Sequence, residues 1–230
     1  MTSTPIRGIS SMATRLVLGE LAEAYAQLSG SEVDIESVGG VDAARRVEAG
    51  EPFDVVFLAS GAIDKLISSG RVVAGSKVDL VHSDVGVAVR AGSPRPDIAS
   101  EDAVRRAVQE ATSIGYSTGP SGVALTKLFE RWGIASEVQP RIVQAPPGVP
   151  VGELVARGEV ALGFQQLSEL MHLDGIDVVG RLPVAIQITT TFSAGLCAAS
   201  THGAEVRRLL DFMGSHAAAE AKRRHGMEPA

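Results

Sequence analysis

The sequence predicts an α/β protein whose strands are mostly parallel and flanked by helices. Segments with strand-like and helix-like spacing of apolar residues alternate along most of the 230 residues. The run FDVVFLA, at 53–59, is continuously apolar, as expected of a strand buried on both faces of a parallel sheet. Repeated strand–helix–strand units of this kind place their helices against the faces of such sheets.

The elements are expected in a regular order. A strand at 6–10 is followed by apolar residues at helical spacing, which predict a helix over 11–28 that ends at Gly30. The segment VDIESV, at 33–38, alternates like a strand. The other predicted strands or β-rich segments are 53–59, 85–90, 113–116, 141–144, 160–164, 176–179 and 186–199. The other predicted helices are 42–48, 62–69, 102–111, 121–132, 151–157, 168–171 and a long terminal helix at 205–224.

Composition excludes several classes of protein. A content of 45% hydrophobic residues is enough for one large domain or two small ones. The net charge is −6 and no basic face is evident, so we expect no nucleic-acid partner. The densest basic run, 222–225, is expected to complement a helix dipole. No run approaches the roughly 20 apolar residues of a membrane span, so no membrane insertion is expected.

Metal and cofactor chemistry is not indicated either. Cys197 is the single cysteine, which excludes a disulfide framework and a cysteine-based zinc site. The five histidines are dispersed without metal-ligand spacing. Neither a phosphate-binding glycine loop nor a hydrolase nucleophile motif is present. We therefore expect no cofactor and no metal.

Six turns that follow predicted strands share Gly, hydroxyl and amide residues with almost no charge. Ligands of α/β folds bind outside the carboxyl ends of strands, where helix N-termini offer unpaired N–H groups. Hydroxyls and amides add neutral donors, so the turns predict a site for a small anion. Each Ser or Thr can alternatively be an ordinary helix cap. The candidate ligand-binding residues are Ser10, Ser11, Gly39, Gly40, Ser60, Ser117, Thr118, Ser121, Gly122, Gly148, Val149, Gln165 and Gln166.

Several longer segments carry a resemblance to a known family. They are ISSMATR, VDAARRVEAGEPFDVVFLASGAIDKLISSGRVV, DLVHSDVGVAVRAGSPRPDI, GPSGVALTKLFERWGI, PVGELVARGEVALGFQQLSEL and KRRHGMEP. Together they resemble the molybdate-type solute-binding proteins of ABC transporters, over nearly the whole chain. The resemblance implies the two-lobe type II periplasmic-binding-protein fold, with a ligand cleft that closes about a hinge. The implied lobes are 1–83 plus 188–230 and 84–187, with hinge strands near 82–84 and 186–191.

The resemblance also implies that hydroxyls and backbone amides hold the anion. The sequence departs from the molybdate pattern at two positions. No hydroxyl stands at 39–41, where the family has a serine, and Gln166 replaces the tyrosine of the family's cleft. These differences favour a larger ligand than a tetrahedral oxyanion, and small carboxylates suit amide and hydroxyl donors.

Two functions remain open. The first is capture of a small anion, an oxyanion or carboxylate, without catalysis. The alternative follows from an equal resemblance to the aconitate-isomerase branch and is isomerisation of a small unsaturated polycarboxylate. The pattern identifies no catalytic residue; Tyr116 and Glu169 are the nearest titratable candidates, as alternatives to a core aromatic and a solvated helix residue.

Location and partners follow from the same comparison. The first residues, MTSTPIRGISS, contain no apolar export signal, so the chain as written is expected in the cytoplasm. If Met1 replaces a removed signal, the protein is periplasmic and an ABC transporter permease is its expected partner. A monomer is expected of a binding protein, whereas an enzyme derived from one need not be a monomer.

Overall fold

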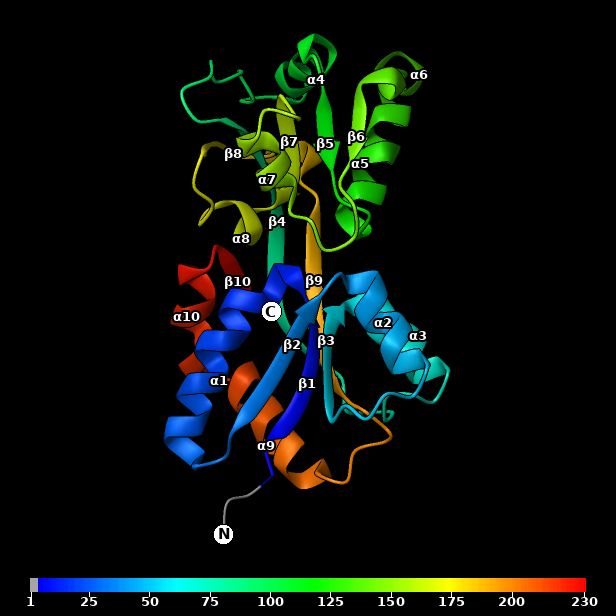
Figure 1. Cartoon of the computed structure of the whole chain (residues 1–230), viewed down its shortest axis with the longest axis vertical. Helices are drawn as coiled ribbons and strands as arrows, with labels where there is room; N and C mark the ends of the chain where they lie inside the picture. Colours follow the sequence, from blue (N-terminus) through cyan, green and yellow to red (C-terminus); the bar gives the residue numbers. More distant parts are fainter. Residues whose placement is uncertain (1–3) are drawn as a thin grey trace. The chain divides into compact units, whose positions relative to one another are not determined.

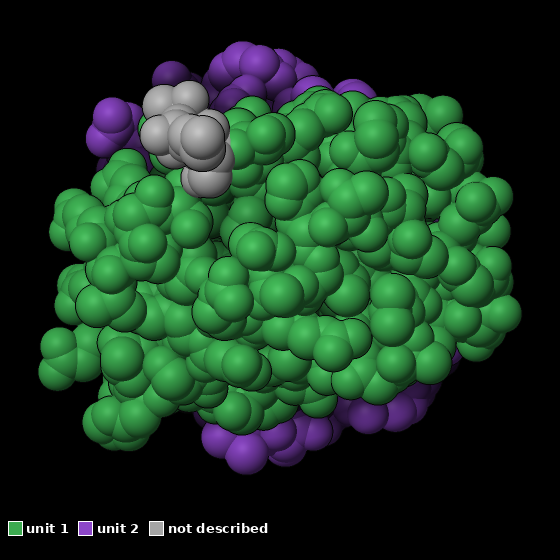
Figure 2. Space-filling view, turned by 90° about the horizontal axis from the view of Figure 1, so that it is seen from below, with its two compact units in different colours: residues 1–82, 191–230 green, residues 83–190 purple. Residues whose placement is uncertain are grey.

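The computed structural model describes residues 4–230, which separate into two compact units. Unit 1 comprises the described residues up to His82 together with Thr191–Ala230, and unit 2 comprises Ser83–Thr190. Figure 2 colours unit 1 green and unit 2 purple. The predicted first lobe also includes residues 1–3, which lie outside the described residues. Closure of two lobes about a hinge stays a prediction.

Unit 1 is built on a sheet with the strand order β2-β1-β3-β9. The strands β1 (Ile6–Ser11), β2 (Val33–Val38) and β3 (Val55–Ala59) are parallel, and β9 (Thr189–Leu196) is antiparallel to β3. Because side chains alternate across a strand, β3 buries residues on both faces of the sheet. The parallel βαβ arrangement predicted for this part of the chain is therefore present.

Helices cover both faces of this sheet (Figure 1). The core on one face joins Val55 and Phe57 to α1 (Arg15–Ser29), α9 (Gly203–Gly214) and α10 (Ala219–Arg224). The core on the other face joins Val56 and Leu58 to α2 (Gly40–Glu48) and α3 (Ser60–Ser68). This double cover explains why 53–59 reads as a continuous apolar run.

Unit 2 contains a second set of strands in the order β4-β7-β5-β6, with β8 paired to β4. β5 is parallel to β6 and β7, whereas β4 is antiparallel to β7 and β8. The strand bounds are β4 (Val78–Arg90), β5 (Ile114–Tyr116), β6 (Ile142–Gln144), β7 (Leu162–Gln166) and β8 (Ile176–Arg181). The helices are α4 (Glu101–Glu110), α5 (Pro120–Arg131), α6 (Ala135–Val138), α7 (Val151–Ala156) and α8 (Leu167–Leu170).

Close packing of α7 against β7 and β5 shapes unit 2. A Cβ at Gly163 of β7 would lie 2.6 Å from Val155 of α7, and one at Gly115 of β5 would lie 3.1 Å from Val151 of α7 and 2.8 Å from Val160, which follows that helix. Only glycine at these two strand positions allows that approach. The short 3-10 turns of the chain are η1 (Met12–Thr14), η2 (Gln139–Arg141), η3 (Val184–Ile186) and η4 (His216–Ala218).

Three sequence predictions about elements are wrong. The terminal helix predicted over 205–224 is broken at Ser215, whose backbone is extended, and the chain ends in a further strand, β10 (Met227–Pro229). The strand predicted at 85–90 begins at Val78. Its first half was missed because the polar residues of VDLVHSD interrupt the apolar pattern. The strand predicted at 160–164 is β7, so Gln165 and Gln166 end the strand and do not form a turn after it.

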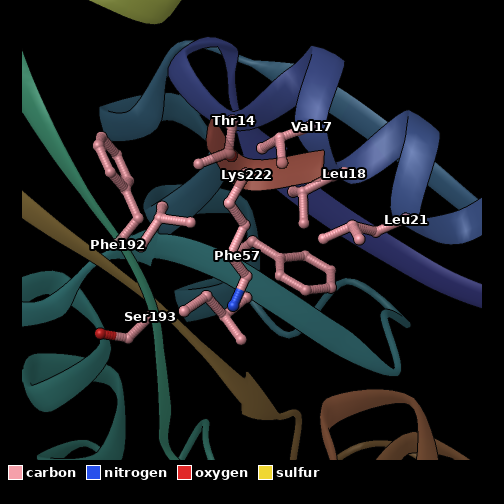
Figure 3. Close-up of a pocket in the computed structure, with 10 residues that line it drawn as sticks. Thr14, Val17, Leu18, Leu21, Phe57, Phe192, Ser193 and Lys222 are labelled. Atoms are coloured by element: carbon pink, nitrogen blue, oxygen red, sulfur yellow. The ribbon is translucent and has the colours of Figure 1, made fainter. Parts of the chain in front are cut away.

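The basic run 222–225 lies in the last turn and C-cap of α10, the position from which it was expected to complement the helix dipole. α10 ends within it, but Lys222 is only 1% exposed and turns into the core of unit 1 (Figure 3). Arg224 and His225 bind Glu20 of α1. Within residues 4–230, no helix is long and apolar enough to cross a membrane.

Candidate functional site

Unit 1 brings three of the predicted turns to one edge of its sheet. β1 lies between β2 and β3, and the three strands are parallel, so their carboxyl ends meet at the same edge. Ser11 ends β1, Gly39 and Gly40 follow β2, and Ser60 begins α3 after β3. Their proximity is direct at one point, because a Cβ added to Gly40 would lie 3.4 Å from Ser11 Cβ.

The two serines of the first turn differ in what they bind. Ser10 is fully buried, and its Oγ lies 2.7 Å from Ser37 Oγ on the neighbouring strand. Ser11 is also buried, at 7% exposure, but its Oγ has no hydrogen-bond partner within residues 4–230. A buried hydroxyl without a partner costs free energy, which a ligand acceptor would recover. Ser11 is therefore the stronger ligand candidate, and Ser10 has a structural partner that sequence reasoning missed.

The two helices that begin at this edge lack side-chain caps. Gly39 is the N-cap of α2 and Ala59 is the N-cap of α3, and neither side chain carries an acceptor. Such helix starts leave N–H groups in need of an acceptor, and the helix dipole favours an anion there. Ser60 is half-buried at the first position of α3.

In unit 2 the loop after β5 is folded tightly against the start of α5. Gly119 is the N-cap and Pro120 the first helical residue, while Ser121 and Gly122 are buried in the first turn. A Cβ at Gly122 would lie 1.9 Å from the carbonyl oxygen of Ser117, so only glycine fits. Ser117 is half-buried and Thr118 is exposed. The last glycine of the Gly-Pro-Ser-Gly pattern therefore has a steric origin, and a role of the pattern in binding stays a prediction.

The end of β7 places two amides in the interior of unit 2. Gln166 is 4% exposed; its Nε2 donates to Thr190 Oγ1 at 2.9 Å, and its Oε1 is buried with no partner among the described residues. Gln165 is 2% exposed, and its Oε1 accepts the Gly152 N–H at 3.2 Å. Neither Thr190 nor Gly152 was predicted; Thr190 lies in a run of three threonines that sequence reasoning assigned only to the hinge.

The fifth turn is less suited to binding than its residue types indicate. Gly148 has a φ of 80° and is exposed, and the N–H of Val149 donates to the Pro146 carbonyl at 3.0 Å. The Val149 amide is thus already engaged within the turn. A ligand role for Gly148 and Val149 stays a prediction.

The two titratable candidates lie in different surroundings. Tyr116 is buried in the main core of unit 2, and this burial raises the pKa of its hydroxyl. Glu169 of α8 is half-buried, and burial raises the pKa of its carboxyl to about 7, although a 2.7 Å hydrogen bond from Gln165 Nε2 acts in the opposite direction. Glu169 is therefore held near the pH at which a carboxyl can both take and release a proton.

The structure offers no alternative centre of metal or thiol chemistry among residues 4–230. No group of three His, Cys, Asp or Glu residues there is placed to hold a metal ion. Cys197 is buried, and burial, followed by the charge of Asp54, raises the pKa of its thiol to about 12. A thiol with so high a pKa is a poor nucleophile at neutral pH.

Comparison with known proteins defines the class. The chain matches the family of bacterial extracellular solute-binding proteins over residues 6–228 and belongs to that family. Its fold is similar to that of the periplasmic molybdate-binding protein of Azotobacter vinelandii, with a TM-score of 0.80 and 21% identity over 96% of this chain and 98% of that one. It is also similar to the sulfate-binding protein SubI of Mycobacterium tuberculosis, with a TM-score of 0.80 and 16% identity over 99% of this chain and 88% of that one. The predicted α/β periplasmic-binding-protein fold is confirmed.

A closer relative in sequence is an enzyme. The chain is 38% identical, over 244 aligned positions, to the aconitate isomerase of a Pseudomonas species. The alignment covers 100% of this chain and 93% of that protein.

Proposed function

We propose that this protein binds a small polycarboxylate anion of the aconitate class. The observation that carries the proposal is the whole-length identity of 38% with an aconitate isomerase. Donors within unit 1 support it, since Ser11 Oγ and the uncapped starts of α2 and α3 suit carboxylate oxygens, and within unit 2 the loop before α5 does so independently. These donors are neutral, so they recognise an anion without burying a permanent cation.

Molybdate and sulfate are the competing ligands. The solved structures with those names share only 16–21% identity with this chain and support the fold alone. Glycine at position 40 removes side-chain bulk next to Ser11, which favours a ligand larger than a tetrahedral oxyanion. Isothermal titration calorimetry with cis-aconitate, trans-aconitate, citrate, molybdate and sulfate tests the choice. We expect a heat of binding with at least one of the carboxylates. A heat of binding with molybdate or sulfate, and none with any carboxylate, would reject the proposal.

Replacing Ser11 with alanine is expected to weaken carboxylate binding about tenfold or more, because a hydrogen bond to a charged acceptor contributes roughly 1.5–3 kcal/mol. The unliganded variant should unfold at an unchanged or slightly higher temperature, since Ser11 Oγ has no partner to lose within residues 4–230. Calorimetric titration and thermal unfolding measure the two effects.

The matched control is Ser10→Ala. This change removes the hydrogen bond to Ser37 and should cost about 1 kcal/mol of folding free energy. Its effect on affinity should be smaller than that of Ser11→Ala. Equal affinities for wild type and Ser11→Ala would remove Ser11 from the binding site.

A second candidate function is isomerisation of the bound polycarboxylate between its cis and trans forms. The specific observation in its favour is Glu169, a half-buried carboxyl whose pKa is raised to about 7 by burial. A proton-NMR time course with cis- or trans-aconitate tests it. Resonances of the other isomer that grow with time would support an enzyme. Binding without new species would support a protein that only binds its ligand.

Membership of an extracellular solute-binding family also bears on location and partners. We infer that the natural protein acts outside the cytoplasmic membrane and delivers its ligand to an ABC transporter permease. Fractionation of cells that express the natural gene tests the location. Recovery of the protein only with the cytoplasmic fraction would contradict both inferences and favour the enzymatic candidate.

A further inference from the structure

The geometry of unit 2 points to one proton-transfer group and one positioning residue for the isomerisation proposed above. We propose that Glu169 takes a proton from the polycarboxylate and returns it, and that Gln165 holds the Glu169 carboxylate in place. The inference rests on the proposed isomerase function. It assigns roles to two side chains that lie in succession on β7 and α8.

The orientation of the Gln165 amide follows from its partners. The backbone N–H of Gly152 can only donate, so the atom that lies 3.2 Å from it must be Gln165 Oε1. The other amide atom, Nε2, therefore faces Glu169 Oε1 at 2.7 Å and donates to it. This hydrogen bond from Gln165 favours the carboxylate form of Glu169, which is the form that can take up a proton.

Packing of α7 holds the Gly152 N–H against the Gln165 amide. A Cβ at Gly152 would lie 2.4 Å from Leu173 and 3.3 Å from Leu170, so glycine lets the start of α7 approach the chain after α8. This contact brings the Gly152 N–H to Gln165, which is itself 2% exposed in the sheet. The amide cannot rotate without leaving both partners, so the acceptor oxygen of Glu169 has a defined position.

The pKa of the Glu169 carboxyl is set by burial and by the hydrogen bond from Gln165, not by a neighbouring charge. Among the described residues Glu169 forms no ion pair, and its pKa responds to burial first and to the Gln165 hydrogen bond second. β7 carries no titratable group. The titratable residues of the other neighbouring segments are Glu153 of α7, Asp177 and Arg181 of β8, Asp79, His82, Asp84 and Arg90 of β4, and His172 and Asp174 after α8.

The reaction balances without a redox partner or a second substrate. The Glu169 carboxylate takes a proton from the methylene carbon next to the double bond of the unsaturated acid. The electron pair of that C–H bond delocalises through the double bond into the conjugated carboxylate, so the former double bond acquires single-bond character and rotates. Glu169 then returns the proton to the methylene carbon, which restores the double bond in the other geometry. Neutral donors stabilise the extra charge of the intermediate.

The test uses the variant Glu169→Gln in the full chain, with cis- and trans-aconitate as substrates. General-base catalysis contributes about 10²–10⁴-fold. We therefore expect turnover to fall at least 100-fold, with substrate affinity within about threefold of wild type by calorimetry. Exchange of the methylene protons in D₂O, followed by proton NMR, should disappear with turnover. The variant should unfold at a temperature no lower than wild type at neutral pH, since glutamine removes a partly buried charge.

Two further variants separate positioning from structure. Gln165→Met removes the donor to Glu169, so the acid limb of the pH profile of kcat/KM should move to higher pH. Glu153→Gln, on the exposed surface of α7, is the matched control and should change neither turnover nor the pH profile. An unshifted acid limb in Gln165→Met would remove the positioning role of Gln165.

The outcomes distinguish this inference from the function on which it rests. Wild-type turnover that survives in Glu169→Gln would overturn the role of Glu169 and leave the isomerase function standing. Binding by the wild type without turnover or methylene exchange would overturn both. Loss of turnover together with loss of binding in Glu169→Gln would show a role in holding the ligand and would also overturn proton transfer.

Discussion

Replacing Lys222 with methionine is expected to raise the free energy of unfolding by about 1–3 kcal/mol at neutral pH, the desolvation penalty of a buried polar group that has no partner. Lys222 is 1% exposed and lines a cavity of about 10 Å³ in unit 1, which is room for a single water molecule. Its neighbours there include Leu18 and Phe57, and the Ser193 oxygen points away from the cavity (Figure 3). In residues 4–230 its ammonium has neither an ion pair nor a hydrogen bond.

The pH dependence of this gain has a defined sign. Burial lowers the pKa of the Lys222 ammonium below its ordinary value of 10.5, so the unfolded chain binds the proton more tightly than the folded protein. The resulting penalty is absent above pH 10.5 and grows as the pH falls toward the folded pKa. The advantage of Lys222→Met should therefore be large at pH 7 and vanish near pH 11.

Urea unfolding at several pH values measures the effect. Lys65→Met is the matched control, because Lys65 is exposed on α3 in the same unit. We expect less than 0.5 kcal/mol from the control. A Lys222→Met variant less stable than wild type would show that the ammonium has a favourable interaction, and unchanged stability at every pH would show that its charge is solvated.

Replacing Gly122 with alanine is expected to destabilise the protein by about 3 kcal/mol and to weaken anion binding at least tenfold. The added Cβ would lie 1.9 Å from the Ser117 carbonyl oxygen and 3.0 Å from the Tyr116 ring. The first of these contacts is with backbone, so a rotamer change cannot relieve it and the loop before α5 must move. That movement displaces the first N–H groups of α5, which are among the proposed anion donors.

The control is Gly119→Ala, three residues earlier in the same loop. Gly119 has a φ of −75°, which any residue adopts, and its added Cβ would lie 3.6 Å from Ser117 Oγ, an ordinary contact. It should lose less than 1 kcal/mol and keep its affinity. Thermal unfolding and calorimetric titration with trans-aconitate compare the two variants. Equal behaviour of the two would mean that the loop is free to rearrange and does not set the donor geometry.

The candidate residues show how far each prediction reached. Ser11, Gly39 and Gly40 were predicted because they follow strands, and the structure brings their turns to one sheet edge. The hydrogen-bond partners of the two serines were not predictable, since Ser10 binds Ser37 and Ser11 has no partner among the described residues. The distinction depends on which neighbouring strand supplies a hydroxyl, and that is settled by register between segments 27 positions apart.

The same reasoning explains the errors. The helix predicted at 205–224 failed because alanine-rich HAAAEAKRR keeps a helical pattern after the chain has turned at Ser215. Lys222 was predicted only to complement a helix dipole with the rest of the basic run, because local charge carries no information about burial. Its cavity is lined by α1, β3, β4 and β9, which come from distant parts of the sequence.

The sequence by itself determined the α/β class, the doubly covered strand β3 and the neutral hydroxyl, amide and glycine residues at the ends of strands. Backbone geometry imposes these patterns locally, with periods of two and 3.6 residues, so a single segment is enough to reveal them. Only the tertiary structure decided which buried polar groups lack a hydrogen-bond partner and how the Gly152 N–H orients the Gln165 amide. It also decided that burial raises the pKa of Glu169 to about 7. These properties depend on desolvation and on partners brought together by folding, and neither is encoded in any one stretch of chain.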